Sequence, residues 1–295
     1  MRELRGIIPA LLTPFTADNG INLDALRALI GMNIKKGVSA FYVGGSTAEA
    51  FLLTSDERKM LLETVVDEVA GRCGVIAHIG AISQDTAEDL ARHARDNGAD
   101  AVSSLPPFYY HFSFEEIKAY YFGIADAIDI PVILYNIPGR TGIGITAETY
   151  KILSQHPNIN GTKEASGDFS LFSRTRALCG DDLFFWSGND DNTIPMMSMG
   201  ALGVISVASN IIPQVVSDIC RFCLNGDLKA ATALYFKYAD LFEKLFLEVN
   251  PIPIKTAMNL LGMDVGNLRL PLCEMAPENL EKLKKSLVSA GLELK

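Results

Sequence analysis

Short strand-like runs alternate with helical patterns along most of the chain, and this alternation constrains the fold more than any other feature. Eight runs rich in β-branched or apolar residues recur, among them "AFYVGG", "GVIAHIG" and "PVILYN". Between them, segments such as "SDERKMLLETVVDEVAG" carry apolar residues at i, i+3, i+4 and i+7, with capping residues at their ends. Strands and helices that alternate with a period of roughly 30 residues favour parallel strands joined by helices. Eight such units predict an α/β fold that closes into a (β/α)8 TIM barrel.

The chain continues beyond the eighth unit, which ends near Asn225. Residues 226–295 contain three further helical patterns. We therefore expect a catalytic barrel over residues 1–225 and a C-terminal helical region over residues 226–295. No low-complexity linker separates the two, so the helical region is expected to pack on the barrel rather than to form an independent module.

The composition argues against several classes of function. With 48% hydrophobic and 21% charged residues, it is typical of a globular protein with a well-filled core. The formal net charge of -9 and the lack of a Lys/Arg cluster argue against a nucleic-acid partner. No apolar run reaches the roughly 18 residues that a membrane span requires, and the N-terminus does not match a signal peptide. We expect no membrane partner and a cytoplasmic protein.

The cysteines and histidines are scattered along the chain. An odd number of cysteines, 5, suits a reducing compartment better than a disulfide framework. Cys220 and Cys223 form a C-x-x-C inside a helical pattern, but no second pair of Cys or His residues lies nearby to complete a zinc site. The sequence therefore predicts neither a metal site nor an organic cofactor.

Lys163 ends the sixth expected strand, in the stretch "NINGTKEASGD". In a parallel barrel the strands' carboxyl ends form the catalytic face, and an inward-pointing lysine there meets few charges. Desolvation lowers the pKa of such a lysine and gives a neutral amine that can attack a carbonyl. The alternatives are an ordinary surface lysine or an ion pair with Glu164, although adjacent strand residues face opposite sides.

Hydroxyl groups at neighbouring strand ends could relay protons for a lysine that forms a Schiff base. Tyr135 ends the fifth strand, and Ser46, Thr47 and Tyr109 are its candidate partners. The alternative for Tyr135 is a core aromatic with a polar tip. The turn "GGSTAEA" lets the backbone approach a carboxylate closely, whereas the dinucleotide pattern G-x-G-x-x-G is absent.

Arg140 lies in the loop "IPGRTGIG" rather than on a charged helix face. A guanidinium there can bind a second carboxylate in a bidentate manner. The alternative is an arginine that stabilises its loop by donating to backbone carbonyls. The sequence alone leaves both interpretations open.

Taken together, these stretches resemble the pyruvate-dependent Schiff-base aldolase superfamily of dihydrodipicolinate synthase and N-acetylneuraminate lyase. The likeness runs from "GIIPALLTPF" through "YVGGSTAEAF", "PPFYY", "YNIPGRTG" and "GTKEASGD" to "NPIPIKTAMNLLG". It implies a homotetramer in which Lys163 forms an imine with pyruvate and Tyr135 relays protons. Ser46 and Thr47 would hold the pyruvate carboxylate, and Tyr109, rather than Tyr110, would complete the relay across a subunit interface. The implied catalytic residues are Lys163, Tyr135, Ser46 and Tyr109, and the implied substrate-binding residues are Ser46, Thr47, Arg140, Gly188, Asp190, Asp191 and Ile205.

The chain mixes features of both branches of this superfamily. "GGSTAEAF", "IAHIGA" and "PPFYYHFSFEE" resemble the lyases, whereas "PGRT", "KEASGD", "SGNDD" and "NPIPIK" resemble the synthases. Arg140 suits the carboxylate of aspartate semialdehyde, while Ala165 and Val207 offer no hydroxyls for a sugar chain. We expect condensation of pyruvate with L-aspartate semialdehyde. The alternatives are cleavage of N-acetylneuraminate or another 2-keto-3-deoxy sugar acid, and a catalytically silent barrel that binds a keto acid.

Two departures from the synthase pattern concern the turn after the second strand, where synthases normally have Thr at Ser46 and Gly at Ala48. The feedback site for lysine in many synthases uses polar groups where this chain has Phe51, Ser55 and Ile82. The resemblance therefore predicts an enzyme that is insensitive to lysine.

Overall fold

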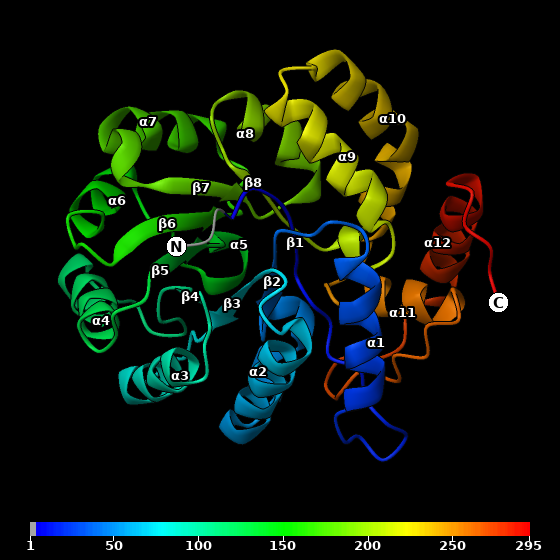
Figure 1. Ribbon diagram of the computed structural model, residues 1–295, viewed down its shortest axis with the longest axis horizontal. Coiled ribbons are helices and arrows are strands. Elements are labelled where there is room, and N and C mark those ends of the chain that lie inside the picture. Colours follow the sequence, from blue (N-terminus) through cyan, green and yellow to red (C-terminus); the bar gives the residue numbers. More distant parts are fainter. Residues whose placement is uncertain (1–3) are drawn as a thin grey trace.

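The computed structural model describes residues 4–295, and within them eight parallel strands form a ring (Figure 1). The strands lie in the order β1-β8-β7-β6-β5-β4-β3-β2, and a parallel bridge between Ala10 and Tyr42 joins the two ends. The predicted TIM barrel is confirmed. The strand bounds are β1 Gly6–Pro9, β2 Ala40–Val43, β3 Gly74–His78, β4 Ala101–Ser104, β5 Val132–Asn136, β6 Ile159–Glu164, β7 Phe184–Ser187 and β8 Gly203–Ser206.

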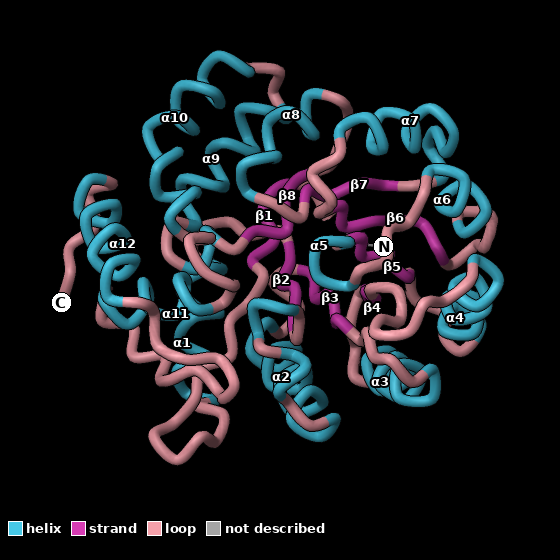
Figure 2. The backbone as a smooth tube through the Cα atoms, turned by 180° about the vertical axis from the view of Figure 1, so that it is seen from behind, coloured by secondary structure: helices cyan, strands magenta, loops and turns pink. Residues whose placement is uncertain are grey.

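Helices surround the ring, and Figure 2 shows them as an outer layer around the strands. Two of them begin with capping boxes, Thr54 with Glu57 and Ser113 with Glu116, which satisfy backbone N–H groups of the first turn. The helices of the barrel are α1 Leu23–Ile34, α2 Ser55–Val69, α3 Gln84–Asp96, α4 Phe114–Asp126, α6 Ala147–Leu153, α7 Phe169–Cys179, α8 Thr193–Ser198 and α9 Pro213–Leu224.

Short helical turns follow several strands and build the carboxyl-end face of the barrel. The four-residue helix α5 lies over the mouth of the ring (Figure 2). These turns are η1 Ser46–Ala48, η2 Ala50–Leu52, α5 Pro138–Thr141, η4 Asp190–Asn192 and η5 Ala208–Asn210. A further turn, η3 Gly180–Asp182, follows α7 and precedes β7 at the other end of the barrel.

Three helices follow α9, namely α10 Leu228–Lys244, α11 Ile252–Leu260 and α12 Pro277–Ser289. Figure 1 shows them gathered on the side of the barrel where β1 and α1 lie. Leu241, Ile254 and Leu283 of these helices belong to the same continuous buried cluster as Ile7 of β1. The division at residue 225 stays a sequence-based prediction, because one core runs through both regions.

A second apolar cluster fills the interior of the ring. It includes Ile8, Tyr42, Tyr135, Trp186 and Ile205, whose side chains point inward from alternate strand positions. The inside of the barrel is thus a packed, water-poor medium into which the ends of the strands open. Within residues 4–295, no helix is long and apolar enough to cross a membrane, and no group of three or more His, Cys, Asp or Glu side chains is arranged to hold a metal ion.

Candidate active site

Lys163 points into the interior of the barrel from β6. Its side chain is only 5% exposed, and its Nζ lies 4.1 Å from the ring centre of Tyr135 and 4.5 Å from that of Tyr42. Burial lowers the pKa of Lys163 below its ordinary value, and the charge of Arg140 also lowers it. A hydrogen bond with the Tyr135 hydroxyl opposes this shift. The site therefore increases the neutral fraction of the amine while keeping two aromatic faces that can stabilise a cation there.

Glu164 faces the opposite side of β6, as the alternation of strand residues requires. Its carboxylate accepts hydrogen bonds from Asn136 Nδ2 and the Tyr150 hydroxyl, both at 2.9 Å, and from the Ser166 N–H at 2.6 Å. All three donors lie outside the barrel interior, so an ion pair between Glu164 and Lys163 is not formed. The carboxylate instead fixes the backbone that carries the lysine.

Tyr135 is opposite Lys163 in the β5–β6 register, and its side chain is buried. Its ring packs edge-on against Tyr42, with ring centres 6.2 Å apart. The Tyr42 hydroxyl donates to Ser103 Oγ at 3.0 Å and is thereby directed toward β4. The two phenols around the amine thus have different partners, and only Tyr135 directs its hydroxyl at Lys163.

The turn after β2 carries Ser46 and Thr47 in η1. Thr47 Oγ1 accepts a hydrogen bond of 3.0 Å from Asn250 Nδ2, which belongs to the loop before α11. Gly45 is required because a Cβ there would lie 2.6 Å from the ring of Tyr42. The Oδ1 atom of Asn250 is buried and has no hydrogen-bond partner in the part of the chain described.

Arg140 lies in α5, and its Nη2 donates to the backbone oxygen of Asn250 at 3.2 Å. It also lines a cavity of about 230 Å³ whose wall includes Ser46, Phe108, Ile137 and Asn250. Phe108 and Ile137 also pack against the inner cluster that contains Tyr135. The structure thus combines the two alternatives for Arg140, since one guanidinium nitrogen stabilises the loop while the residue forms part of a cavity wall.

The residues expected after β7 and β8 have different surroundings. The buried Asp190 carboxylate accepts bonds from Ser206 Oγ at 2.5 Å and from the N–H groups of Val207 and Ala208, both at 3.0 Å. Burial raises the pKa of Asp190, although these hydrogen bonds oppose the shift. Asp190 therefore links the turns after β7 and β8. Ile205 lies in the inner cluster of the barrel.

Gly188 and Asp191 complete the set of expected substrate-binding residues. A Cβ on Gly188 would lie 2.5 Å from the Cβ of Ala165, so glycine permits the close approach of the loops after β6 and β7. Asp191 lines a separate cavity with Tyr235 and Phe236 of α10, and it is not part of the wall that contains Arg140. The structure does not bring Asp191 together with Arg140.

Tyr109 and Tyr110 lie on an exposed loop after β4. Their side chains are 80% and 61% exposed, and their rings meet edge to face with centres 5.1 Å apart. Tyr109 has φ 81°, a left-handed conformation that is uncommon for a residue with a side chain. Neither phenol lines the cavity of its own chain, so a role for Tyr109 in a neighbouring subunit stays a prediction.

Sequence reasoning missed three groups near the site. His78 is buried in contact with the rings of Tyr42 and Tyr135, and its Nδ1 bonds to the Gly44 oxygen at 2.9 Å. Burial, with help from the charges of Arg58 and Lys163, lowers the pKa of His78 well below its ordinary value, so the ring is neutral at pH 7. His78 and Tyr42 could have been found from their inward positions on β3 and β2. Asn250 lies in a loop, where no strand alternation indicates the direction of its side chain.

Comparisons with known proteins agree with this geometry. The family model described as the dihydrodipicolinate synthetase family matches residues 3–290. A 4-hydroxy-tetrahydrodipicolinate synthase of Thermoanaerobacter pseudethanolicus is 42% identical over 99% of this chain and 98% of its own length. A dihydrodipicolinate synthase structure from Aquifex aeolicus has a TM-score of 0.96 and 39% identity, covering 99% of both chains. A chloride-inhibited dihydrodipicolinate synthase from Acinetobacter baumannii, complexed with pyruvate, has a TM-score of 0.95 and 34% identity over 98% of this chain and 99% of its own. The resemblance found in the sequence is confirmed, and the chain belongs to the dihydrodipicolinate synthetase family.

Proposed function

We propose that this chain is a 4-hydroxy-tetrahydrodipicolinate synthase, a lyase of the class I aldolase type that condenses pyruvate with L-aspartate semialdehyde in the biosynthesis of diaminopimelate and lysine. The observation that carries the proposal is the desolvated amine of Lys163, held between two phenol rings at the mouth of the barrel. The names of the full-length relatives support the same reaction.

The chemistry begins when the neutral amine of Lys163 attacks the C2 ketone of pyruvate. The resulting carbinolamine loses water and becomes a protonated imine, and the Tyr135 hydroxyl relays the protons that these steps move. The positive imine nitrogen then accepts electrons as C3 loses a proton, which gives an enamine. The enamine carbon attacks the aldehyde, and hydrolysis or cyclisation frees the lysine. No step requires a metal ion or an organic cofactor.

The carboxylates of the two substrates bind to different residues. Ser46 and Thr47, with the N–H groups of their turn, receive the carboxylate of pyruvate. Arg140 receives the carboxylate of the aldehyde, because its guanidinium lines the cavity above the inner cluster. Gly188 and Ile205 shape the pocket around the imine, and Asp190 acts by holding the turn after β8.

A reductive trap tests the proposal. Wild-type protein is incubated with pyruvate and sodium borohydride, and its intact mass is measured beside that of Lys163→Ala. We expect a stable pyruvate adduct in the wild type and none in the variant. An unmodified wild type would instead favour the silent keto-acid-binding barrel.

The choice of substrate needs a second assay. Aspartate semialdehyde with pyruvate is compared with N-acetylneuraminate and other 2-keto-3-deoxy sugar acids, and condensation is expected to be the faster reaction. Ala165 and Val207 support this ranking, since neither offers a hydroxyl to a sugar chain. Faster cleavage of N-acetylneuraminate would reassign the protein to the lyases.

We further propose that the protein is a cytoplasmic homotetramer. The exposed pair Tyr109 and Tyr110 supports association, because large aromatic side chains at 80% and 61% exposure are typical of interfaces rather than of free surface. Sedimentation velocity is expected to give the mass of four chains. A monomer at assay concentrations that retains full activity would contradict both the tetramer and the role of Tyr109.

A further inference from the structure

A fully buried ion pair joins the turn after β2 to the C-terminal helical region. Lys255 Nζ of α11 donates to Glu49 Oε1 at 2.8 Å, and the two side chains are 1% and 0% exposed. The amine also donates to the backbone oxygen of Thr13 at 3.0 Å and lies 4.1 Å from the ring centre of Phe15. The second oxygen of Glu49 accepts the Arg269 N–H at 2.8 Å.

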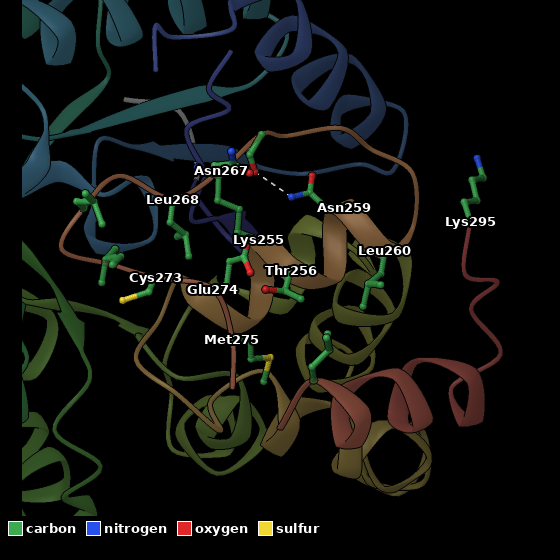
Figure 3. Close-up of a pocket in the computed structure, with 14 residues that line it drawn as sticks. Lys255, Thr256, Asn259, Leu260, Asn267, Leu268, Cys273, Glu274, Met275 and Lys295 are labelled. Carbon is green, nitrogen blue, oxygen red and sulfur yellow. Dashed lines mark hydrogen bonds between the residues drawn. The ribbon is translucent and has the colours of Figure 1, made fainter. Parts of the chain in front are cut away.

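Lys255 lies beside a cavity, and a small number of contacts fix the position of its amine. Figure 3 shows Lys255 on α11 beside a cavity that also contains Thr256, Asn259 and Met275 in its wall. The cavity has a volume of about 640 Å³, and its wall includes residues from α11, from the loop that follows it and from α12. The amine itself is buried, and its contacts with Thr13, Phe15 and Glu49 define where it lies.

The backbone of Glu49 shows why its carboxylate must be held. With φ 60° and ψ 34°, Glu49 is in the left-handed region, where a residue with a side chain is disfavoured. It lies between η1, which carries Ser46 and Thr47, and η2, whose residues line the cavity near Arg140. Such a conformation persists only where surrounding contacts fix it. The bonds to Lys255 and Arg269 are contacts of this kind.

The same C-terminal segment restrains the site at two other points. Asn250 Nδ2 donates to Thr47 Oγ1, and the Asn250 backbone oxygen accepts from Arg140 Nη2. In addition, Thr13, whose backbone oxygen accepts from Lys255, donates its hydroxyl to the Ala48 oxygen at 2.8 Å. Through Lys255 and Asn250, residues 250–255 therefore contact the turn that we assign to pyruvate and the arginine that we assign to the aldehyde. A buried ion pair is weak evidence for a purely stabilising role, because desolvation of two buried charges can exceed their attraction.

We infer that the Lys255–Glu49 ion pair is a positioning device for the carboxylate-binding turn, and this inference rests on the proposed function. Lys255 does not line the cavity that contains Arg140, and Glu49, which does, keeps its carboxylate fully buried against Lys255 and Arg269. Glu49 acts through Ser46 and Thr47 by fixing the kink that directs their hydroxyl and N–H groups, and Lys255 acts by fixing Glu49. The pair should therefore affect how tightly pyruvate binds, with little effect on the intrinsic reactivity of Lys163, which lies on β6.

The test replaces both charges at once. Glu49→Gln with Lys255→Met removes the ion pair without leaving a lone buried charge, and it preserves approximate side-chain volume. Imine formation is followed by borohydride trapping and intact mass over a range of pyruvate concentrations. We expect the half-saturating pyruvate concentration to rise about 10- to 100-fold, as for a displaced positioning group. The trapping rate at saturating pyruvate should stay within about threefold of the wild type, since the Lys163 site is unchanged.

A destabilised control separates positioning from loss of stability. Leu283→Ala creates a cavity under α12, at a side chain that is fully buried and belongs to the main core. It should lower the melting temperature but leave the half-saturating pyruvate concentration unchanged. If the double variant does not fold, Lys255→Arg, which keeps the buried charge but changes the geometry of its bond to Glu49, is measured in the same way.

The outcomes distinguish this inference from the proposed function. A wild type that traps no pyruvate overturns the proposed function, and the inference with it. A wild type that traps normally, beside a folded variant with an unchanged half-saturating concentration, overturns the inference alone. A rise in that concentration matched by Leu283→Ala would also overturn it, because general destabilisation would then explain the effect.

Discussion

Replacing Tyr135 with Phe should slow imine formation strongly, whereas Tyr42→Phe should not. The two phenol rings lie at similar distances from the amine, 4.1 and 4.5 Å, so both variants keep an aromatic face beside the cation. Only Tyr135 shares a hydrogen bond with Lys163, while the Tyr42 hydroxyl donates to Ser103. Loss of a general acid–base group costs about 10²- to 10⁴-fold in rate, or about 3 to 5 kcal/mol of activation free energy. For Tyr42→Phe we expect less than about tenfold, with a stability loss of about 1 kcal/mol from the hydrogen bond to Ser103.

The effect of Tyr135 on the pKa of Lys163 allows two causes of an altered rate in Tyr135→Phe to be distinguished. The charge interaction with Tyr135, and the hydrogen bond that its hydroxyl oxygen accepts from the ammonium, raise the pKa of Lys163 against the lowering by burial. Tyr135→Phe should therefore lower that pKa further and increase the neutral fraction of the amine at pH 7. If deprotonation of the lysine limited the reaction, the variant would be faster than the wild type.

Rapid-quench borohydride trapping, followed by intact mass as a function of pH, measures both effects. We expect Tyr135→Phe to show a slower plateau that is reached at lower pH. A rate for Tyr135→Phe within threefold of the wild type, or an equal loss in Tyr42→Phe, would refute the assignment of the proton relay to Tyr135.

Three further predictions concern the second substrate, regulation and acid stability. Arg140→Ala should lower kcat/KM for aspartate semialdehyde about 10- to 150-fold, because it removes a hydrogen bond to a charged group, while pyruvate trapping persists. A loss confined to N-acetylneuraminate cleavage, with condensation unchanged, would reverse our ranking of the substrates. Calorimetric titration with lysine should show no micromolar binding. Such binding would contradict the prediction, made from Phe51, Ser55 and Ile82, that the enzyme is insensitive to lysine. Arg269 lowers the pKa of Glu57 from 4.5 to about 2, so this pair contributes stability above pH 4.5 that is lost as the pH falls toward 2. Glu57→Gln should flatten the decline of the melting temperature between pH 5 and 3, and an unchanged decline would exclude this contribution.

The barrel could be predicted because its signals are local. Each strand is a short apolar run, each helix has its own periodicity and caps, and the repetition of the unit implies a closed ring. The burial of Lys163 followed in the same way from its place at the end of a strand. The opposite directions of Lys163 and Glu164 followed from the alternation of side chains along β6.

The remaining features of the site depend on contacts between distant segments. Glu49 lies in "GGSTAEA" and Asn250 in "NPIPIK", yet no local pattern shows that Glu49 contacts Lys255 or that Asn250 contacts Thr47. Asp190 was expected to bind substrate, but the positions of its hydrogen-bond donors after β8 could be known only from the folded barrel. The role predicted for Tyr109 requires a neighbouring subunit, whose surface a single sequence does not describe.

The contacts made by residues 250–255 have a consequence for the order in which the protein matures during translation. Asn250 and Lys255 reach partners that lie 203 and 206 positions earlier in the chain. A ribosome that has synthesised all eight strands has therefore not yet released the segment that restrains the turn at Ser46 and Thr47. Until that segment leaves the exit tunnel, the nascent barrel lacks two of the restraints on its pyruvate site, so competence to capture the keto acid should arise late in synthesis.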